Sequence, residues 1–421
     1  MRVVVFGKTL YAAVMAALLA ECGHQVLWCN IFQDQQHLLQ SSYIAQDASL
    51  SKLLEQQETK GFLSFCDFAE LPLDLDVYFF SFNPTEESFA LKILEQLQQR
   101  PIIHPKLMVN ASTFGIHGTA RLQRLLSQDD WVYLPDIVQE GNAVQSMTAA
   151  KQLIVGCDSE SVKVKVRELL RALFPRSQQF LFMSILDAEF TKLSISGMLA
   201  TRISFINDLA VVAEKLGVDI DHVRQGMSAD SRIGSAYLSP GAGFGGENFS
   251  HDLLTLATTV SITGAKSRLL NQVWEINEQQ KELLFRKLWN YYQGDLAGKT
   301  IAIWGASFKE NTPRTEHSPI HTMLVALWAQ GVTVRLHDPQ ALQEISAIYG
   351  KRDDLILCAE QYEAVEGASA LCLITAWKQY WVLDYPQLLK KMVHPLILDG
   401  RNIYNPDYVK AQGFAYMGVG R

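Results

Sequence analysis

The chain has 421 residues and a formal net charge of −7, with 48% hydrophobic and 19% charged residues. This length predicts two or three domains with sizeable cores. The acidic balance, without any Lys/Arg run, gives no reason to expect nucleic acid as a partner. The six cysteines lack CxxC spacing, and no apolar stretch reaches transmembrane length. We therefore expect a soluble, cytoplasmic protein with reduced thiols and no membrane contact.

The first 30 residues predict the opening of a dinucleotide-binding domain. An apolar run over Val3–Phe6 is stopped by Gly7, and helical periodicity follows over Leu10–Glu21. The segment His24–Cys29 then has the composition of a second strand. Strand, glycine turn, helix and strand in this order are typical of the βαβ unit that binds dinucleotides.

The glycine fingerprint of that unit is altered in this chain. The turn runs Gly7-Lys-Thr9-Leu-Tyr-Ala12, so only the first glycine of G-x-G-x-x-G remains. Thr9 introduces a β-branched side chain where the backbone would approach a pyrophosphate. Asn30 stands where an acidic residue would bind the ribose diol, and an amide lacks the charge that makes such an acceptor strong.

Strands and helices continue to alternate through the first part of the chain. This alternation predicts a mostly parallel sheet. We expect further strands over Asp76–Phe80, Leu107–Asn110, Trp131–Leu134 and Gln152–Gly156, with a helix over Glu86–Gln98.

A long helical pattern from Asp187 to Leu216 separates this part from a second α/β region. A helix of that length often serves as a connector or a dimerisation element. A predicted strand followed by a glycine turn occurs again at Ile301–Gly305. Later strands are expected over Val332–Leu336, Leu355–Leu357, Ala370–Ile374 and Leu396–Leu398.

The resulting fold prediction is an α/β protein with two Rossmann-like doubly wound domains, joined by a helical middle domain that contains the long connecting helix. The expected domains are a dinucleotide-binding domain over 1–185, a central helical domain over 186–293, and a C-terminal domain over 294–421.

The most distinctive stretch is the glycine-rich loop between Pro240 and Asp252, which leads into an apolar helical pattern. Glycines let the backbone come close to a ligand, and the N-terminus of the following helix favours a phosphate or a developing oxyanion. The alternative is a tight turn with Ser250 as the helix cap. The four loop glycines are Gly241, Gly243, Gly245 and Gly246.

Several polar residues are placed where α/β proteins bind ligands. Lys192 and Ser196 are four residues apart, so they share a face of the long helix, although a solvated lysine is the simpler interpretation. Ser112-Thr113 and Glu140 follow expected strand ends, where a pocket group, a turn or a surface carboxylate would all fit.

Charged residues of the later segments add to this pattern. Arg232 precedes Gly234 in a polar loop and could pair with a phosphate, and Lys309 and Arg401 each follow an expected strand. His317 and His321 have helical ligand spacing, but no third ligand accompanies them, so we expect no metal site.

Together these motifs resemble the UDP-glucose/GDP-mannose dehydrogenase family over essentially the whole chain. The resemblance rests on seven motifs in order: Lys192-x-x-x-Ser196, Ser204-Phe-Ile-Asn207, Arg232-Ile-Gly234, Leu238-Ser-Pro-Gly-Ala-Gly-Phe-Gly-Gly246, Gly305-Ala-Ser-Phe-Lys-Glu-Asn-Thr312, His337-Asp-Pro339 and Asp399-Gly-Arg-Asn402.

The resemblance implies an NAD-dependent oxidation of the C6 alcohol of a nucleotide sugar to a carboxylate, through an aldehyde and a cysteine-bound thioester. It implies that Lys192 stabilises oxyanions, that Asp252 assists water and proton transfer, and that Thr113 and Glu140 contribute to proton transfer.

The resemblance also assigns residues to the UDP-sugar site and implies a homodimer formed through the central helix. Arg232 is expected to reach a neighbouring subunit's site. The implied UDP-sugar residues are Ser196, which replaces an asparagine, together with Arg232, Gly241, Gly243, Gly245, Gly246, Lys309 and Arg401.

The chain departs from the family at its redox positions. Asn248 occupies the position of the nucleophilic cysteine, and a carboxamide cannot form a thioester. Glu316 replaces an arginine expected to meet the cofactor, although Arg314 could compensate. The remaining cofactor residues are Gly7, Thr9 and Asn30. Each altered charged contact costs about 1–3 kcal/mol of NAD affinity.

Two functions remain open from the sequence. The first is a pseudoenzyme that binds a UDP-sugar and senses it or partners an active paralogue. The second is an active NAD(P)-dependent oxidoreductase with two-electron or non-covalent chemistry on a nucleotide sugar, for which Lys8 and Asn30 would permit NADP.

Overall fold

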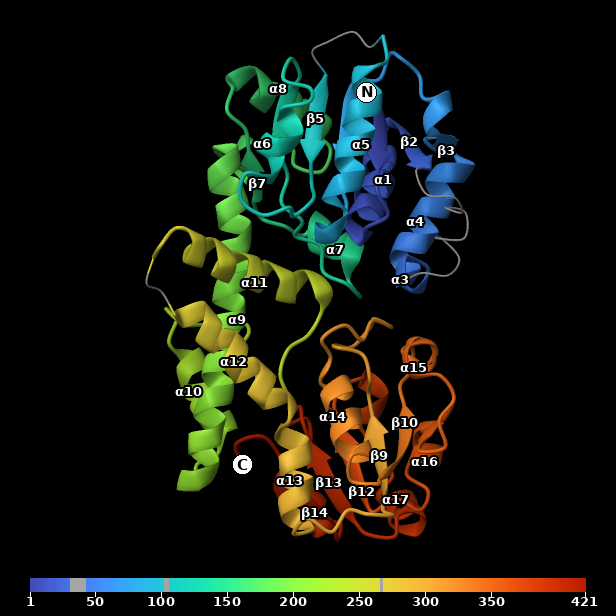
Figure 1. Cartoon of the computed structure of the whole chain (residues 1–421), viewed down its shortest axis with the longest axis vertical. Coiled ribbons are helices and arrows are strands. Elements are labelled where there is room, and N and C mark those ends of the chain that lie inside the picture. The colour runs from blue at the N-terminus through green and yellow to red at the C-terminus, as the bar shows by residue number, and fades with distance from the viewer. Residues whose placement is uncertain (31–42, 102–105, 266–267) are drawn as a thin grey trace. The chain divides into compact units, whose positions relative to one another are not determined.

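The computed structural model describes residues 1–30, 43–101, 106–265 and 268–421 (Figure 1). The chain divides into two compact units, Met1–Ile195 and Ser196–Arg421, which we call the first unit and the second unit. Each unit contains one sheet covered by helices on both faces. The predicted α/β fold with Rossmann-like domains and a helical middle region is confirmed.

The first unit is built on an eight-stranded sheet with the order β3-β2-β1-β4-β5-β6-β7-β8, in which only the β6–β7 pair is antiparallel. Its strands are β1 (Arg2–Phe6), β2 (Gln25–Asn30), β3 (Leu63–Asp67), β4 (Val77–Phe80), β5 (Leu107–Asn110), β6 (Asp130–Tyr133), β7 (Leu153–Gly156) and β8 (Phe180–Met183). Its helices are α1 (Leu10–Glu21), α3 (Tyr43–Gln46), α4 (Ala48–Thr59), η1 (Phe68–Glu70), η2 (Pro84–Glu86), α5 (Glu87–Gln98), α6 (Gly118–Gln123), α7 (Ala143–Thr148), α8 (Glu160–Leu169) and η3 (Ser177–Gln179).

The alternating direction of the side chains along β1 explains why this sheet is covered by helices on both faces. Val3 and Val5 pack into the core that contains α1, α4, α7 and α8, whereas Val4 and Phe6 pack into the core under α5 and α6. Successive strand residues point to opposite faces, so an uninterrupted apolar strand needs helices on both sides. This arrangement leaves the C-terminal edge of the parallel strands free to carry loops.

The second unit contains most of a long helix, further helices and a six-stranded parallel sheet with the order β11-β10-β9-β12-β13-β14. The helices before the sheet are α9 (Ile185–Leu216), which begins in the first unit, then α10 (Ile220–Ala229), α11 (Glu247–Ile262), α12 (Leu269–Lys281) and α13 (Leu283–Tyr291). The remaining elements are β9 (Thr300–Trp304), α14 (Pro319–Trp328), β10 (Thr333–His337), α15 (Leu342–Tyr349), β11 (Leu355–Leu357), α16 (Gln361–Ala364), β12 (Ala370–Leu373), η4 (Lys378–Tyr380), α17 (Tyr385–Lys391), β13 (Leu396–Asp399), α18 (Pro406–Ala411) and β14 (Ala415–Met417).

The second sheet is also doubly wound. Helices α13, α14 and α15 contribute to the core on one face, and α16, α17 and α18 contribute to the core on the other. Each β strand of this sheet pairs in parallel with its neighbours. The loops after β9, β12 and β13 therefore emerge at one edge, where parallel sheets bind ligands.

Helix α9 has 32 residues and passes the length and composition test for a membrane-crossing helix. From the sequence we expected no stretch of transmembrane length, because charged residues such as Lys192 and Arg202 interrupt every contiguous apolar run of this helix. The mean hydropathy of the helix nevertheless stays apolar. Core helices of soluble proteins pass the same test. In α9, 39% of the 18-residue apolar stretch is buried. Length and composition are therefore weak evidence for a membrane span.

Candidate functional site

The glycine-rich loop is held in the second unit by buried side-chain amides of α9 and α12. The Oδ1 atom of Asn207 accepts a hydrogen bond from the Gly241 N–H at 2.9 Å, and Gln280 donates to the Gly241 carbonyl at 2.7 Å. Asn277 accepts from the Phe244 N–H at 2.8 Å and donates to its carbonyl at 3.1 Å. Buried amides that match backbone groups in this way fix the loop in one conformation.

Close packing explains why the end of this loop requires glycine. Gly246 has a φ of +92°, which side chains rarely adopt, and an added Cβ would lie 3.0 Å from the Phe308 ring. A Cβ on Gly245 would lie 2.7 Å from the backbone of His317. The Gly246 N–H donates to the Glu316 carbonyl at 2.8 Å. The loop is therefore pressed against the segment that connects β9 to α14.

Asn248 is exposed and is the second residue of α11, directly after the glycine loop. One turn later Asp252 is buried, and its Oδ2 atom accepts a hydrogen bond from the Ser196 hydroxyl at 2.7 Å. The structure thus brings two predicted site residues, Ser196 and Asp252, into direct contact. Lys192 lies one turn before Ser196 on the same helix and is half-buried.

Arg401 lies beside the glycine loop. Its Nε atom donates to the Ile374 carbonyl at 2.6 Å, and a Cβ added to Gly241 would lie 3.1 Å from its guanidinium. Burial lowers the pKa of Arg401, and the carboxylates of Glu310 and Asp399 oppose that effect. The ammonium group of Lys309 lies 5.7 Å from the centre of the Phe308 ring. The loops after β9 and β13 therefore bring both predicted cations to the neighbourhood of Phe308 and the glycine loop.

Glu316 does not present an isolated negative charge. Arg314 lies 2.8 Å from Glu316 and 2.7 Å from Glu247, so one guanidinium bridges two carboxylates. Burial would raise the pKa of Glu316, but its hydrogen bonds and ion pair with Arg314 lower it below its ordinary value. Arg314, considered from the sequence as a compensating charge, therefore pairs with Glu316 itself. The same contact also ties the first turn of α11 to the segment before α14.

Arg232 has a side chain that is 87% exposed and lies 2.6 Å from Asp230. The hydrogen bonds of Asp230 raise the pKa of Arg232. The loop is held by Arg202 of α9, which donates to the carbonyls of Ile233, Gly234 and Ala236 at 2.8–3.0 Å. Sequence reasoning missed this role of Arg202, because only the fold brings the helix and the loop together.

The predicted cofactor residues of the first unit lie at the C-terminal edge of its sheet. Gly7 follows β1 with a φ of +105°, and an added Cβ would meet the Ser81 carbonyl at 1.8 Å. Thr9 is the N-cap of α1: its hydroxyl accepts from the Ala12 N–H at 3.0 Å and contacts the Ser81 hydroxyl. Asn30 ends β2 opposite Asp67.

These residues fit NAD in part. Gly7 and Thr9 would face the pyrophosphate, and a bound NAD would supply hydride-accepting chemistry. The Thr9 hydroxyl, however, already occupies one N–H group of the first turn of α1. Such N–H groups are the usual donors to a phosphate at a helix N-terminus.

Thr113 and Glu140 follow the neighbouring strands β5 and β6, and both are half-buried. The segment that follows Thr113 is fixed by Glu189 of α9, whose carboxylate accepts from the His117 and Thr119 N–H groups at 2.7 Å each. Burial raises the pKa of Glu189 against the effect of these hydrogen bonds. Glu189 thus attaches the helix that carries Lys192 to the loop that carries Thr113.

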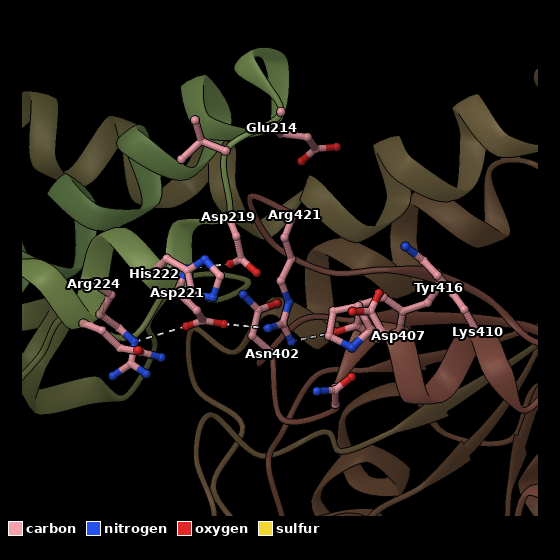
Figure 2. Close-up of a pocket in the computed structure, with 15 residues that line it drawn as sticks. Glu214, Asp219, Asp221, His222, Arg224, Asn402, Asp407, Lys410, Tyr416 and Arg421 are labelled. Carbon is pink, nitrogen blue, oxygen red and sulfur yellow. Dashed lines mark hydrogen bonds and ion pairs between the residues drawn. The ribbon is translucent and has the colours of Figure 1, made fainter.

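A polar pocket of about 600 Å³ lies elsewhere in the second unit, among α9, α10 and the C-terminal segment (Figure 2). Asp221 in its wall lies between Arg224 at 3.1 Å and Arg421 at 2.7 Å and forms an ion pair with each (Figure 2). No residue proposed for a site from the sequence lines this pocket. In the described part of the chain, no group of three or more His, Cys, Asp or Glu side chains is placed to hold a metal ion.

The two doubly wound α/β folds, and the glycine-rich loop that lies between them in the sequence, define a dehydrogenase architecture. Sequence models of the UDP-glucose/GDP-mannose dehydrogenase family match its NAD binding domain at residues 1–174, its central domain at 186–279 and its UDP binding domain at 302–406. The chain belongs to this family, whose cofactor is NAD.

Individual relatives support the same assignment. The chain is 32% identical to a UDP-glucose 6-dehydrogenase of Pseudomonas aeruginosa, over 100% of this chain and 98% of the relative. It is 27% identical to the UDP-glucose 6-dehydrogenase TuaD of Bacillus subtilis, over 100% and 93%. The fold is similar to that of a UDP-glucose dehydrogenase from Pyrobaculum islandicum, with a TM-score of 0.87, 23% identity, and coverage of 100% and 97%.

Proposed function

We propose that this chain binds a UDP-sugar but does not complete the four-electron oxidation of its C6 alcohol, and that it acts as a ligand sensor or as the partner of an active paralogue. The observation that carries this proposal is Asn248, an exposed carboxamide at the start of α11 where the family resemblance places the nucleophilic cysteine. A carboxamide cannot form the thiohemiacetal and thioester that the covalent route requires.

The remaining cysteines of the second unit support the loss of this nucleophile. Cys358 and Cys372 are completely buried in the cores on the two faces of its sheet. Burial raises the pKa of Cys372 to about 12 and also raises the pKa of Cys358. A reactive cysteine needs access and a depressed pKa, and neither thiol offers these.

The UDP-sugar part of the proposal rests on the rigid glycine loop. Its backbone is fixed by Asn207, Asn277 and Gln280, and Arg401 lies against Gly241. A preorganised loop loses little conformational entropy when a ligand binds. The proposed UDP-sugar residues remain Ser196, Arg232, Gly241, Gly243, Gly245, Gly246, Lys309 and Arg401.

Weak cofactor binding is the second part of the proposal. The Thr9 hydroxyl competes with a phosphate for the first turn of α1, and Glu316 replaces a positive charge with a carboxylate that Arg314 neutralises. Together these changes remove attraction for a pyrophosphate without creating a strong local repulsion.

A second candidate is an active NAD(P)-dependent oxidoreductase that transfers two electrons or uses no covalent intermediate. It is favoured by the buried Ser196–Asp252 hydrogen bond and by Lys192 on the same helix, because these polar groups would still serve proton transfer and oxyanion stabilisation. The proposed roles of Thr113 and Glu140 belong to this candidate as well.

We also propose a cytoplasmic homodimer formed through α9. Met198, Phe205 and Val212 are seven residues apart and are 62%, 49% and 49% exposed. Large apolar side chains repeated at this interval lie along one side of a helix and suit a partner helix.

The deciding experiment combines ligand binding and turnover. Purified protein is incubated with UDP-glucose and either NAD or NADP while reduced-cofactor absorbance is followed, and thermal shifts are recorded with each ligand alone. Stabilisation by UDP-glucose without absorbance change supports the pseudoenzyme. Multi-turnover cofactor reduction would establish the second candidate, and the absence of any UDP-sugar effect would contradict the retained sugar site.

A further inference from the structure

Two cysteines of the first unit lie directly opposite each other on neighbouring strands. Cys29 of β2 and Cys66 of β3 are partners in a parallel pair. The strands β2 and β3 lie at one edge of the sheet (Figure 1). Both belong to the same side of the sheet, since Cys29 is part of the core that includes Phe6 and Phe80, and Cys66 packs against that core. Their side chains therefore extend from adjacent backbone positions into the same layer.

The backbone spacing at this pair suits a disulfide. Neighbouring strands lie about 4.8 Å apart, and bridged cysteines have Cα atoms about 4.4–6.8 Å apart. The two thiols are also close enough to share a hydrogen bond. The thiols can thus reach each other without a change of register.

The two thiols differ in access and in acidity. Cys29 is completely buried, whereas Cys66 is half-buried. The hydrogen bond from Cys29 lowers the pKa of Cys66, against the opposing effects of burial and of the Glu70 and Asp67 carboxylates. The same hydrogen bond and burial raise the pKa of Cys29. Cys66 is the accessible partner that ionises first, and thiolates are the form that oxidants attack.

The other four cysteines lack this combination. Burial raises the pKa values of Cys22, Cys157, Cys358 and Cys372, and for Cys22 the value rises to about 11. The pairing with Cys29 therefore distinguishes Cys66 from every other thiol of the chain.

We propose that Cys29 and Cys66 form a reversible intramolecular disulfide when the protein meets a peroxide. In the first step the Cys66 thiolate attacks hydrogen peroxide, the O–O bond breaks, and with one proton the products are a sulfenic acid and water. In the second step the Cys29 sulfur attacks the Cys66 sulfur, the S–O bond breaks, and the Cys29 proton leaves with the hydroxyl as a second water. Two thiols are oxidised and one peroxide is reduced to two waters.

The disulfide would join the edge strand β3 to β2, directly before Asn30 and Asp67 at the C-terminal edge of the sheet. Edge strands open more readily than central strands, so a covalent link at this point restrains the edge strand. Disulfide formation requires neither UDP-sugar nor NAD binding, so its test is independent of the proposed function.

The test oxidises the full chain under native conditions with hydrogen peroxide, blocks free thiols with iodoacetamide, and analyses intact mass and tryptic peptides. The expected result is a mass loss of about 2 Da before alkylation, a link between Cys29 and Cys66, and reversal by dithiothreitol. Cys22 shares a tryptic peptide with Cys29, because no Lys or Arg lies between them. The Cys22→Ser variant is therefore the matched control and should form the same link.

The Cys66→Ser variant should remain fully reduced, and Cys29→Ala should convert the reaction at Cys66 to unpaired sulfenic or sulfinic acid. If Cys29→Ala does not fold, Cys66→Ser and wild type still decide the question. An unreacted wild-type protein, a link that uses Cys22, or a gain of oxygen at Cys66 without a link would overturn the proposal.

Discussion

Arg314 and Glu247 form an ion pair of 2.7 Å that joins the first turn of α11 to the segment before α14. The Arg314 side chain is 11% exposed and also contacts Glu316 at 2.8 Å. Glu316, which departs from the family pattern, and Glu247 therefore share one guanidinium. Breaking the contact leaves two carboxylates close together without their common partner, which should destabilise the second unit.

We expect Arg314→Met to lower the free energy of unfolding by about 1–3 kcal/mol, because both carboxylates remain partly buried. Urea unfolding at pH 7 measures this change. Arg352→Met is the matched control, since Arg352 pairs with Asp354 at the surface and its loss should destabilise the protein less. Equal effects of the two variants would contradict the buried character of the Arg314 contact.

The same ion pair predicts a pH dependence. Because the folded protein lowers the pKa of Glu316 below 4.5, this group contributes stability above pH 4.5. The contribution is lost as the pH falls through the lower folded-state pKa. Unfolding curves between pH 7 and pH 3 should show a smaller loss of stability on acidification for Arg314→Met than for wild type. An equal loss of stability in the two proteins would show that the Arg314–Glu316 ion pair does not lower the pKa of Glu316.

Asn248→Cys restores the nucleophile position without, in our prediction, restoring turnover. The side chain is exposed, so stability should change by less than about 0.5 kcal/mol. Turnover should stay absent because the cofactor contacts are also altered. Reduced-cofactor absorbance measures the reaction, and thiol labelling controls for access to the new cysteine. Sustained turnover would place the whole loss of activity at residue 248.

Ser196→Ala should destabilise the protein by about 1–2 kcal/mol, because the buried Asp252 carboxylate loses a charge-assisted hydrogen bond. Thermal or urea unfolding measures the effect. Ser194→Ala, on the half-buried neighbouring position of α9, is the control and should change stability by about 0.5 kcal/mol or less. A double-mutant cycle with Asp252→Asn should give a coupling energy, and strict additivity would argue against the contact.

Gly246→Ala should abolish the thermal shift produced by UDP-glucose and cost about 1–3 kcal/mol of stability. The added methyl group meets both an unfavourable φ of +92° and the Phe308 ring. Gly264→Ala is the control, since that residue also has a positive φ of +76° but open space around it. A normal ligand shift in Gly246→Ala would show that the loop can relax without loss of the site.

Phe205→Glu should convert the proposed dimer to a monomer, because it places a charge on the exposed apolar side of α9. Light scattering coupled to size exclusion measures the mass. Phe89→Glu introduces the same change on α5, where Phe89 is 40% exposed, and should leave the mass unchanged. A monomeric wild-type protein would contradict the proposed dimer directly.

Much of the architecture was predictable because local periodicity is strong in this chain. The apolar run Val3–Phe6, the restart at Ile301–Gly305 and the long pattern ending at Leu216 all correspond to observed elements. The edge strands β3, β8 and β14 were missed. The mixed sequences of β3 and β14 carry no clear alternation, and the four-residue apolar run of β8 is too short to distinguish from a helical segment. Hydrogen bonding to the neighbouring strands stabilises β3 and β14 as strands.

By itself, the glycine-rich stretch from Pro240 to Asp252 indicated either a ligand-binding loop or a tight turn, since few other structures need four glycines so close together. The sequence also determined that no cysteine stands in this loop. Only the tertiary structure decided which groups hold it, because Asn207, Asn277, Arg314 and Arg401 are distant in the sequence and give no local pattern. Hydrogen bonds and ion pairs between remote segments depend on three-dimensional distance, and the fold alone sets that distance.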